Sequence, residues 1–380
     1  MGGRGPESAL FRARRAAERS GVTRLADVTG LDRLGVPVFQ AIRPWSRALS
    51  VHQGKGLVPE AAQIGALMEA IESEHAESFL APGPLCPFAE LPASERAPKL
   101  SDFALHRRRT PDERTPVRWV EGRTLLDDRR LWAPFDIVSL DFTRAAPSPF
   151  ERSSAGLAAH FTREDAVRAA LLEVIERDAV ARWMSRGLLE RTLSRIDSES
   201  IPFPWFQRIR GRLSIAGVRL SIYRAEAAIA TPVFVCELIE PEAVALGRGA
   251  VFGSACRPGG EAALLHGVLE AIQSRLTEIV GARDDIGLPP AQTVQPAPLG
   301  LGLPSPARAE PRSWAEPEGQ RAGPPVSAQD LARSLAKAGY AQAAVVDLSR
   351  RGEDVIVVKA IVPGLAGMRR SRREPSAPPC

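Results

Sequence analysis

Short apolar runs rich in β-branched residues alternate along this chain with longer segments of helical periodicity, and this alternation strongly restricts the fold. The apolar runs predict strands at 37–42, 136–142, 218–223, 231–238, 343–348 and 355–362. The helical segments are 58–78, 164–186, 261–280 and 327–339, the last preceded by Ser327 as an expected N-cap. Strands mixed with helices predict an α/β or α+β protein and exclude all-helical and all-β folds.

Composition places the 380-residue chain among soluble globular proteins, with 44% hydrophobic and 25% charged residues. It contains no apolar run of the ~18 residues that a membrane helix needs. The first 20 residues lack the apolar segment of a signal peptide. Four scattered cysteines, none in a CxxC, predict neither a disulfide framework nor structural zinc. We therefore expect a protein of the reducing cytoplasm that does not bind a membrane.

The positive charge of the chain is confined to its ends. The formal charge is +5 and the isoelectric point about 9.4. Residues 1–20 and 368–380 each carry a net +3, whereas the 347 residues between them sum to about −1. Short basic ends bind polyanions weakly and are commonly a matter of solubility. We therefore expect no specific nucleic-acid partner.

A segment rich in proline and glycine interrupts the pattern near the C-terminus. Residues 287–325 contain ten prolines and five glycines, too many for a packed layer. Strand-like residues resume after it, so it is expected to loop out of one folded unit. The predicted organisation is a basic arm at 1–20, a core at 21–286, the excursion at 287–325, the rest of the core at 326–366 and a mobile basic tail at 367–380.

Three of the predicted helices share one internal pattern. In each, a glutamate is followed nine positions later by a second glutamate, and three positions after that by a glutamate or a glutamine. The three sets are Glu60, Glu69 and Glu72; Glu164, Glu173 and Glu176; and Glu261, Glu270 and Gln273. Small and apolar positions between them also correspond, so the agreement exceeds that of ordinary amphipathic helices.

Two of these helices carry a pair of neighbouring carboxylates, because helical positions three apart are adjacent. Like charges at this spacing destabilise a helix by roughly 0.2–0.5 kcal/mol. A single such pair is usually a solvated face, but the same costly choice at two corresponding places indicates a compensating cation. Carboxylate oxygens suit Mg²⁺, so Glu69, Glu72, Glu173 and Glu176 are candidate ligands that could hold Mg²⁺ against a triphosphate.

Several cations accompany the repeated helices. Lys55 stands between two glycines just before the first helix, where it could meet a phosphate. A plain turn is the alternative, because the Walker A pattern is absent. Arg177 and Arg275 lie on the second and third helices. They are either ordinary exposed arginines or, beside Mg²⁺, groups that neutralise phosphate charge.

Two more segments flank these helices. Residues 154–159 precede the second helix as the glycine-flanked lysine precedes the first, and Ser154 is either a turn residue or a phosphate contact. Residues 283–285, Arg-Asp-Asp, close the third helix as a salt-bridge cluster or as substrate contacts. No serine, cysteine or histidine pattern typical of nucleophilic catalysis is present.

Taken together, these motifs resemble the YcaO-domain family, whose members activate peptide backbone amides with ATP. The matching segments are 23–32, 35–38, 43–56, 68–72, 173–179, 270–275, 281–285 and 362–365. The resemblance covers roughly residues 21–286 and 326–366, and its motifs are specific in combination. It is strongest to YcaO proteins that work with a TfuA-type partner.

The resemblance implies an α/β, YcaO-like fold of mixed strands and helices, with an ATP and Mg²⁺ site between the glutamate-bearing helices. It implies that the magnesium ligands are Glu69, Glu72, Glu173 and Glu176. It implies nucleotide or phosphate contacts by Lys55, Ser154, Arg177, Glu270, Gln273 and Arg275. Arg177 and Arg275 are the residues expected to act in catalysis.

The implied reaction is phosphorylation of an amide oxygen as a nucleophile adds to the carbonyl. A Cys, Ser or Thr of the peptide gives an azoline, and an external sulfur donor gives a thioamide. The C-terminus lacks the strict PxPxP ending of azoline-forming members, which favours thioamide formation. The implied partners are a precursor peptide and a TfuA-like or leader-binding protein, and a homodimer is compatible with the resemblance.

The chain departs from the family pattern at several positions. Ser73 replaces a frequent arginine, Gly65 a small hydroxyl residue, Ala155 a polar residue, and His160-Phe161 a Gly-Asn pair. The His160 change falls where nucleotide binding is expected. Together with Ala155 and Ser73, it motivates a second hypothesis, a non-catalytic ATP-binding or scaffold subunit of a modification complex.

Overall fold

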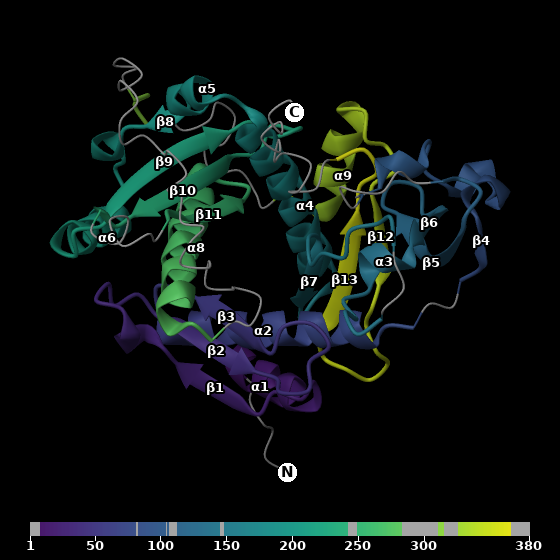
Figure 1. Cartoon of the computed structure of the whole chain (residues 1–380), viewed down its shortest axis with the longest axis horizontal. Coiled ribbons are helices and arrows are strands. Elements are labelled where there is room, and N and C mark those ends of the chain that lie inside the picture. The colour runs from purple at the N-terminus through teal and green to yellow at the C-terminus, as the bar shows by residue number, and fades with distance from the viewer. Residues whose placement is uncertain are drawn as a thin grey trace, which may run out of the picture.

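Three antiparallel sheets, each covered by one long helix, form the described part of the protein (Figure 1). The computed structural model describes residues 8–80, 83–103, 105, 112–144, 148–241, 249–282, 311–314 and 326–365. Its mixture of helices and sheets confirms the predicted α/β fold class. No helix in these ranges is long and apolar enough to cross a membrane.

The first sheet has the order β1-β2-β3, with strands Arg24–Asp27, Val38–Ile42 and Val51–Lys55. Helix α2 (Pro59–Ser78) packs on β2 and β3, and α1 (Ala9–Arg19) packs on α2. Ala13, Ala16 and Ala17 of α1 are buried. Residues 9–19 of the expected basic arm are therefore helical and packed against the folded body.

The second sheet has the order β11-β10-β9-β8, with strands Val251–Cys256, Val233–Ile239, Arg219–Ala225 and Arg195–Ile196. Helix α8 (Gly260–Val280) packs on β10 and β11. Helix α6 (Pro204–Ile215) contacts β9, and the short α5 (Leu188–Leu193) precedes β8.

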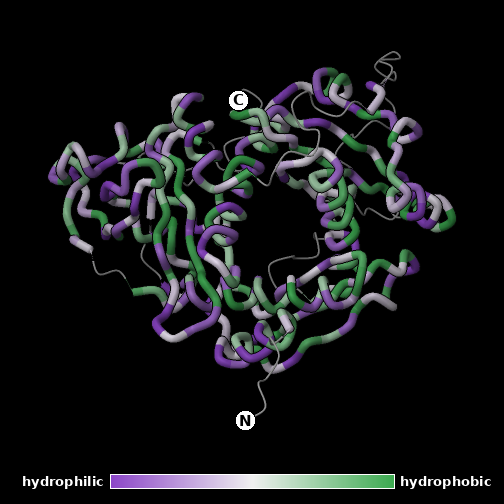
Figure 2. The backbone as a smooth tube through the Cα atoms, turned by 180° about the vertical axis from the view of Figure 1, so that it is seen from behind, coloured by the Kyte–Doolittle hydropathy of each residue, from purple (hydrophilic) through white to green (hydrophobic). Residues whose placement is uncertain are grey.

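The third sheet has six strands in the order β4-β5-β12-β13-β7, with β6 paired to β5. In that order the first five are Leu85–Pro87, Pro116–Thr124, Ala344–Asp347, Ile356–Ile361 and Leu157–His160, and β6 is Arg130–Pro134. Helix α4 (Arg163–Ser185) packs on β7 and β13, and α9 (Ala328–Lys337) packs on α4. The central strands β12 and β13 are mostly hydrophobic (Figure 2).

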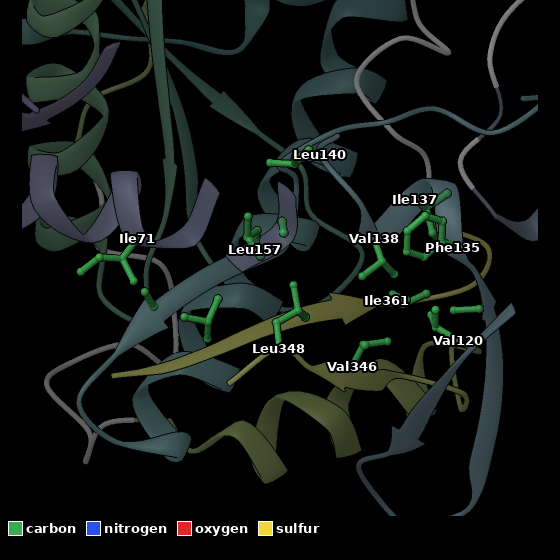
Figure 3. Close-up of a cluster of buried hydrophobic side chains, with 14 of the residues drawn as sticks. Ile71, Val120, Phe135, Ile137, Val138, Leu140, Leu157, Val346, Leu348 and Ile361 are labelled. Atoms are coloured by element: carbon green, nitrogen blue, oxygen red, sulfur yellow. The ribbon is translucent and has the colours of Figure 1, made fainter. Parts of the chain in front are cut away.

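Most of the predicted elements are confirmed, including all four helices, but one strand prediction is wrong. The run at 136–142 forms α3 (Phe135–Val138), a single helical turn followed by residues outside any strand. Phe135, Ile137, Val138 and Leu140 point into one apolar core, which explains the apolar run (Figure 3). A short apolar run cannot separate a strand from a buried helical turn.

The helix termini and short turns complete the description. Ser327 is the N-cap of α9 and forms a capping box with Asp330, as its position in the sequence predicted. The 3₁₀ turns are Thr29–Leu31, Phe88–Glu90, Ala93–Glu95, Leu100–Asp102 and Ser198–Ser200. The excursion at 287–325 lies outside the described residues except for 311–314, as do the tail at 367–380 and the Arg-Asp-Asp segment at 283–285.

The three glutamate-bearing helices are arranged in a ring. Each packs on its own sheet and also contacts the edge strand of the next one: α2 contacts β7, α4 contacts β11, and α8 contacts β3. Figures 1 and 2 show α2, α4 and α8 around one central region from opposite sides. Because the repeated motif lies on these helices, the ring brings its residues toward one another.

Two glycines in the edge strands allow this close packing. A Cβ on Gly54 of β3 would lie 2.0 Å from the Ala62 carbonyl oxygen of α2. A Cβ on Gly253 of β11 would lie 2.1 Å from the Ala271 nitrogen of α8. Both strands therefore need glycine where the helix backbone approaches.

Candidate active site

The second glutamate of each carboxylate pair bonds to the edge strand of the next sheet. Glu72 of α2 accepts a hydrogen bond from the Ala159 backbone nitrogen of β7 at 2.8 Å. Glu176 of α4 accepts one from the Cys256 backbone nitrogen of β11 at 3.1 Å and another from the Ser254 hydroxyl at 2.7 Å. The second glutamate of each pair therefore lies at a junction between sheets rather than on a solvated face.

The first glutamate of each pair bonds close to its own sheet. Glu69 accepts a hydrogen bond from the Gln53 backbone nitrogen of β3 at 2.6 Å. Glu173 accepts one from the Gly156 backbone nitrogen, just before β7, at 3.1 Å. Arg177 lies one turn further along α4 and donates to Glu173 at 3.2 Å.

Helix α8 completes the ring, but its residues at the motif positions bond differently from those of α2 and α4. Its Glu270 is paired with Lys55 of β3, with 3.1 Å between Nζ and Oε2. Gln273 occupies the place of Glu72 and Glu176, and its amide nitrogen lies 3.5 Å from the Gln53 carbonyl oxygen. The third junction thus has an amide facing a carbonyl where the other two have a carboxylate facing a backbone N–H.

Burial and like charge disfavour ionisation of two of these carboxylates. Burial, with repulsion from Glu173 and Glu69, raises the pKa of Glu72 well above its usual value. Burial, with repulsion from Glu270 and Glu173, raises the pKa of Glu176 to about 7 despite the nearby Arg177. A cation beside these groups would restore their charged form.

The cations of the site act on Glu270 and Arg177. Burial disfavours the charged form of Glu270, but Lys55 and Arg177 outweigh it and lower the pKa of Glu270. Burial likewise opposes the charge of Arg177, but Glu176, Glu173 and Glu270 raise its pKa. Positive charge therefore lies between α4 and α8, next to Glu176 and Glu270.

The structure brings together every predicted site residue on α2, α4 and β3, together with Glu270 and Gln273. Ser154 is exposed and lies two residues before Gly156, whose N–H donates to Glu173. Arg275 is the exception, because its guanidinium is held by Asp32 at 3.2 Å and Glu240 at 2.6 Å. Two residues along a helix turn a side chain to another face, so the geometry does not support the predicted nucleotide contact of Arg275.

The departures from the family pattern have structural partners. Ser73 is buried, with its hydroxyl 3.4 Å from Nδ1 of His52. His160 ends β7 opposite Ile356 of β13, and burial lowers its pKa. Phe161 stacks with Arg12 of α1, 4.1 Å from the ring centroid. These residues therefore join the elements that surround the site.

One further cation, Lys359 of β13, was not among the predicted site residues. Its side chain is buried and donates to the Ser153 carbonyl, next to Ser154. Burial lowers the pKa of Lys359 to about 8, although Glu173 and Glu151 favour its charge. The signal in the sequence was a lysine inside an apolar strand, in a chain with four lysines in all.

The donor set fits a metal that retains other ligands. Within the described ranges, no group of three or more His, Cys, Asp and Glu side chains forms a complete metal site. Glu72 with Glu173, and Glu176 with Glu270, instead form carboxylate pairs between neighbouring helices. Mg²⁺ is usually held by one or two carboxylates together with water and phosphate oxygens, which matches such pairs.

A family model described as YcaO cyclodehydratase, ATP- and Mg²⁺-binding, matches residues 53–366. The chain belongs to the YcaO family. Among curated YcaO relatives is a Rhizobium leguminosarum bv. trifolii protein of uncharacterised function from the tfuA 3′ region, 36% identical over 272 residues. The match covers 70% of this chain and 64% of that protein, so the chain spans less than two thirds of this relative's length.

An uncharacterised Mycobacterium tuberculosis protein is 32% identical over 274 residues, covering 70% of this chain and 60% of that protein. The YcaO structure from Methanopyrus kandleri, bound with AMPPCP and Mg²⁺, has a TM-score of 0.68 and 23% identity. It covers 98% of this chain and 95% of that one. The E. coli microcin synthetase McbBCD complex with pro-MccB17 has a TM-score of 0.64 and 16% identity, covering 89% and 87%.

These comparisons confirm the predicted family and the YcaO-like fold. The family description names ATP and Mg²⁺ and so confirms the expected cofactors, and it places the chain in a family of enzymes. One relative is encoded in a tfuA 3′ region, and one structural neighbour is a microcin synthetase with pro-MccB17 bound.

Proposed function

We propose that this protein binds ATP and Mg²⁺ between α2, α4 and α8 and uses them to activate the backbone amides of a precursor peptide. The observation that carries the proposal is that two glutamates with a raised pKa, Glu72 and Glu176, lie next to further carboxylates in a cluster that also holds Lys55 and Arg177. The carboxylates outnumber these two cations, and a bound Mg²⁺ would supply the missing positive charge.

The residues divide by chemistry. Glu69, Glu72, Glu173 and Glu176 offer carboxylate oxygens to Mg²⁺. The residues that would contact the nucleotide are Lys55, Arg177, Ser154, Glu270 and Gln273, and the two cations among them would supply positive charge for its phosphates. Arg177 is fixed by Glu173 at 3.2 Å, so its charge is held in place before a phosphate arrives.

The proposed reaction makes an amide oxygen into a leaving group. ATP supplies the phosphoryl group that this oxygen takes up as a nucleophile adds to the amide carbon, and the oxygen departs as phosphate. Lys55 and Arg177 neutralise the negative charge on the phosphate oxygens during the transfer. Glu270 orients Lys55 through their 3.1 Å ion pair.

We infer that the product is a thioamide, formed with an external sulfur donor and a TfuA-like partner. The curated relative from the tfuA 3′ region supports this choice over an azoline. Mass spectrometry of a co-expressed precursor peptide separates the two, because replacing oxygen by sulfur adds mass whereas cyclodehydration loses water. A product that has lost water would contradict the thioamide proposal.

The activity itself is tested by ATP consumption that depends on the precursor peptide. We expect Glu176→Ala and Arg177→Ala to abolish it. Glu237→Gln is the matched control, since Glu237 is also a buried glutamate bonded to a hydroxyl, that of Tyr223 at 3.0 Å, but its other charged neighbours lie outside the site. Turnover unaffected by both alanine variants would contradict the proposal.

The alternative, a non-catalytic scaffold subunit, predicts a different result. It predicts intact nucleotide binding with no ATP turnover when the peptide and every partner are supplied. The departures at His160, Ala155 and Ser73 motivate this alternative.

A further inference from the structure

Strand β13 holds both ends of the turn that carries Ser154. The Ala360 backbone nitrogen donates to the Gly156 carbonyl at 2.7 Å, and the Lys359 ammonium donates to the Ser153 carbonyl. Between these two anchors, Ser154 is exposed. The conformation of this turn is therefore set by two adjacent residues of a distant strand, since Lys359 follows Ser153 by 206 positions.

The same turn is joined to the carboxylate cluster. Gly156 has a φ of +80°, and its nitrogen donates to Glu173 at 3.1 Å. A Cβ on Gly156 would lie 2.6 Å from Val174 and 2.7 Å from the Ala360 carbonyl oxygen, so the turn fits tightly between α4 and β13. A shift of the Ser153 end would change both the place of Ser154 and the hydrogen bond to Glu173.

Burying the ammonium group of Lys359 at this position costs free energy. Its neighbours on the same strand face, Val357 and Ile361, are buried in an apolar core, and Lys359 is equally buried, at 3% exposed. In the part of the chain that the structure describes, the Ser153 carbonyl is its hydrogen-bond acceptor. A buried ammonium destabilises the folded protein unless it is paired, so an apolar residue here would make the core more stable.

We propose that Lys359 is a positioning residue of the nucleotide site, which holds the 153–156 turn so that Ser154 and Glu173 meet Mg²⁺ and phosphate together. This inference rests on the proposed function for its ligand, but the hold of Lys359 on the turn is a property of the protein alone. The two can therefore be tested separately.

The first test is binding of a non-hydrolysable ATP analogue with Mg²⁺ by calorimetry. We expect Lys359→Met, which keeps the length of the side chain without its charge, to raise the dissociation constant about tenfold. Val357→Ala is the matched control, because it weakens the same strand without touching Ser153, and it should change the constant less than about twofold. If Lys359→Met does not fold, Lys359→Gln retains a donor and should give a smaller rise.

A double-mutant cycle tests whether Lys359 acts through Ser154. If it does, Ser154→Ala combined with Lys359→Met should bind the analogue no more weakly than the weaker of the two single variants. Fully additive effects would contradict the proposed route. An unchanged dissociation constant in a destabilised Lys359→Met protein would reduce Lys359 to a structural residue.

Amide hydrogen exchange tests the turn without any nucleotide. The Gly156 and Leu157 amides donate to Glu173 and to the Ser154 carbonyl, so they should exchange faster in Lys359→Met but not in Val357→Ala. Unchanged exchange would overturn the proposal. Wild-type protein that fails to bind the analogue would contradict the proposed function, while exchange still decides whether Lys359 holds the turn.

Discussion

Glu72 of α2 and Ala159 of β7 are joined by a 2.8 Å hydrogen bond across 87 positions of sequence, from a backbone N–H to a carboxylate. Glu176 repeats this relationship with Cys256 of β11 at 3.1 Å. Each bond connects a helix to the sheet that the next helix covers. The magnesium ligands that we propose are therefore also the contacts that hold the sheets around the site.

Glu72 is expected to lower the stability of the Mg²⁺-free protein while strengthening Mg²⁺-dependent nucleotide binding. Burial, and repulsion from Glu173 and Glu69, disfavour its charge, whereas a glutamine could still accept the Ala159 hydrogen bond. We expect Glu72→Gln to raise the melting temperature at pH 8 without Mg²⁺ and to weaken Mg²⁺-dependent nucleotide binding at least tenfold. Glu60→Gln, on the exposed first turn of α2, should change neither appreciably. A variant with lowered stability and intact binding would contradict this account.

Mg²⁺ binding should release a proton near neutral pH. Burial, with Glu270 and Glu173, raises the pKa of Glu176 to about 7, so this carboxyl must lose its proton before it can bind a cation. The apparent affinity for Mg²⁺ should therefore rise between about pH 6 and pH 8. Calorimetry in buffers of different ionisation enthalpy measures the released proton. Glu176→Gln should lose both the rise and the release, and a pH-independent wild-type affinity would contradict the role of Glu176.

Stability should fall in mild acid because of His266. Burial, together with Arg257 and Lys55, lowers the pKa of His266 to about 4, compared with ~6.5 in an unfolded chain. The unfolded state then binds more protons, so the free energy of unfolding should decrease as the pH falls from ~6.5 to ~4, by at most about 3 kcal/mol. Urea denaturation across this range measures the effect. His266→Gln should flatten the dependence of the free energy of unfolding on pH. An unchanged dependence would mean that other groups cause the loss of stability.

Gly54 should tolerate no side chain. A Cβ there would lie 2.0 Å from the Ala62 carbonyl oxygen and 2.2 Å from the Ala66 nitrogen, both backbone atoms of α2. We expect Gly54→Ala to lower the free energy of unfolding by about 3 kcal/mol or to prevent folding. Gly211→Ala in α6 is the control, because its Cβ would meet nothing within 4 Å and alanine favours a helix. Equal stabilities of the two variants would contradict the close packing of β3 on α2.

Among the elements that the sequence did not predict are the edge strands before the three repeated helices. Strands β3, β7 and β11 contain Gly54, Ala158 and Gly253, small residues that are poor indicators of a strand. They are small because the helices pack so closely on them. The small residues that allow the helices to pack closely also interrupt the apolar pattern that would predict these strands.

The placement of Arg275 and Lys359 shows the same limit within the site. Arg275 shares a helix with Glu270 and Gln273, yet it binds Asp32 and Glu240 outside the cluster. Lys359 lies far from every repeated helix in the sequence, yet it reaches the turn before β7. Distance along the chain therefore does not indicate which charged residues lie close to the cluster.

By itself, the sequence determined the mixed fold class, the four long helical segments, the repeated glutamate spacing and the family. These depend on local periodicity and on motifs within one element. Only the tertiary structure decided which carboxylates meet, that Gln273 faces a carbonyl where Glu72 faces an N–H, and that Lys359 contacts the turn before β7. Such contacts depend on how three sheets pack around their helices, and helical periodicity carries no information about strands 80 or more residues away.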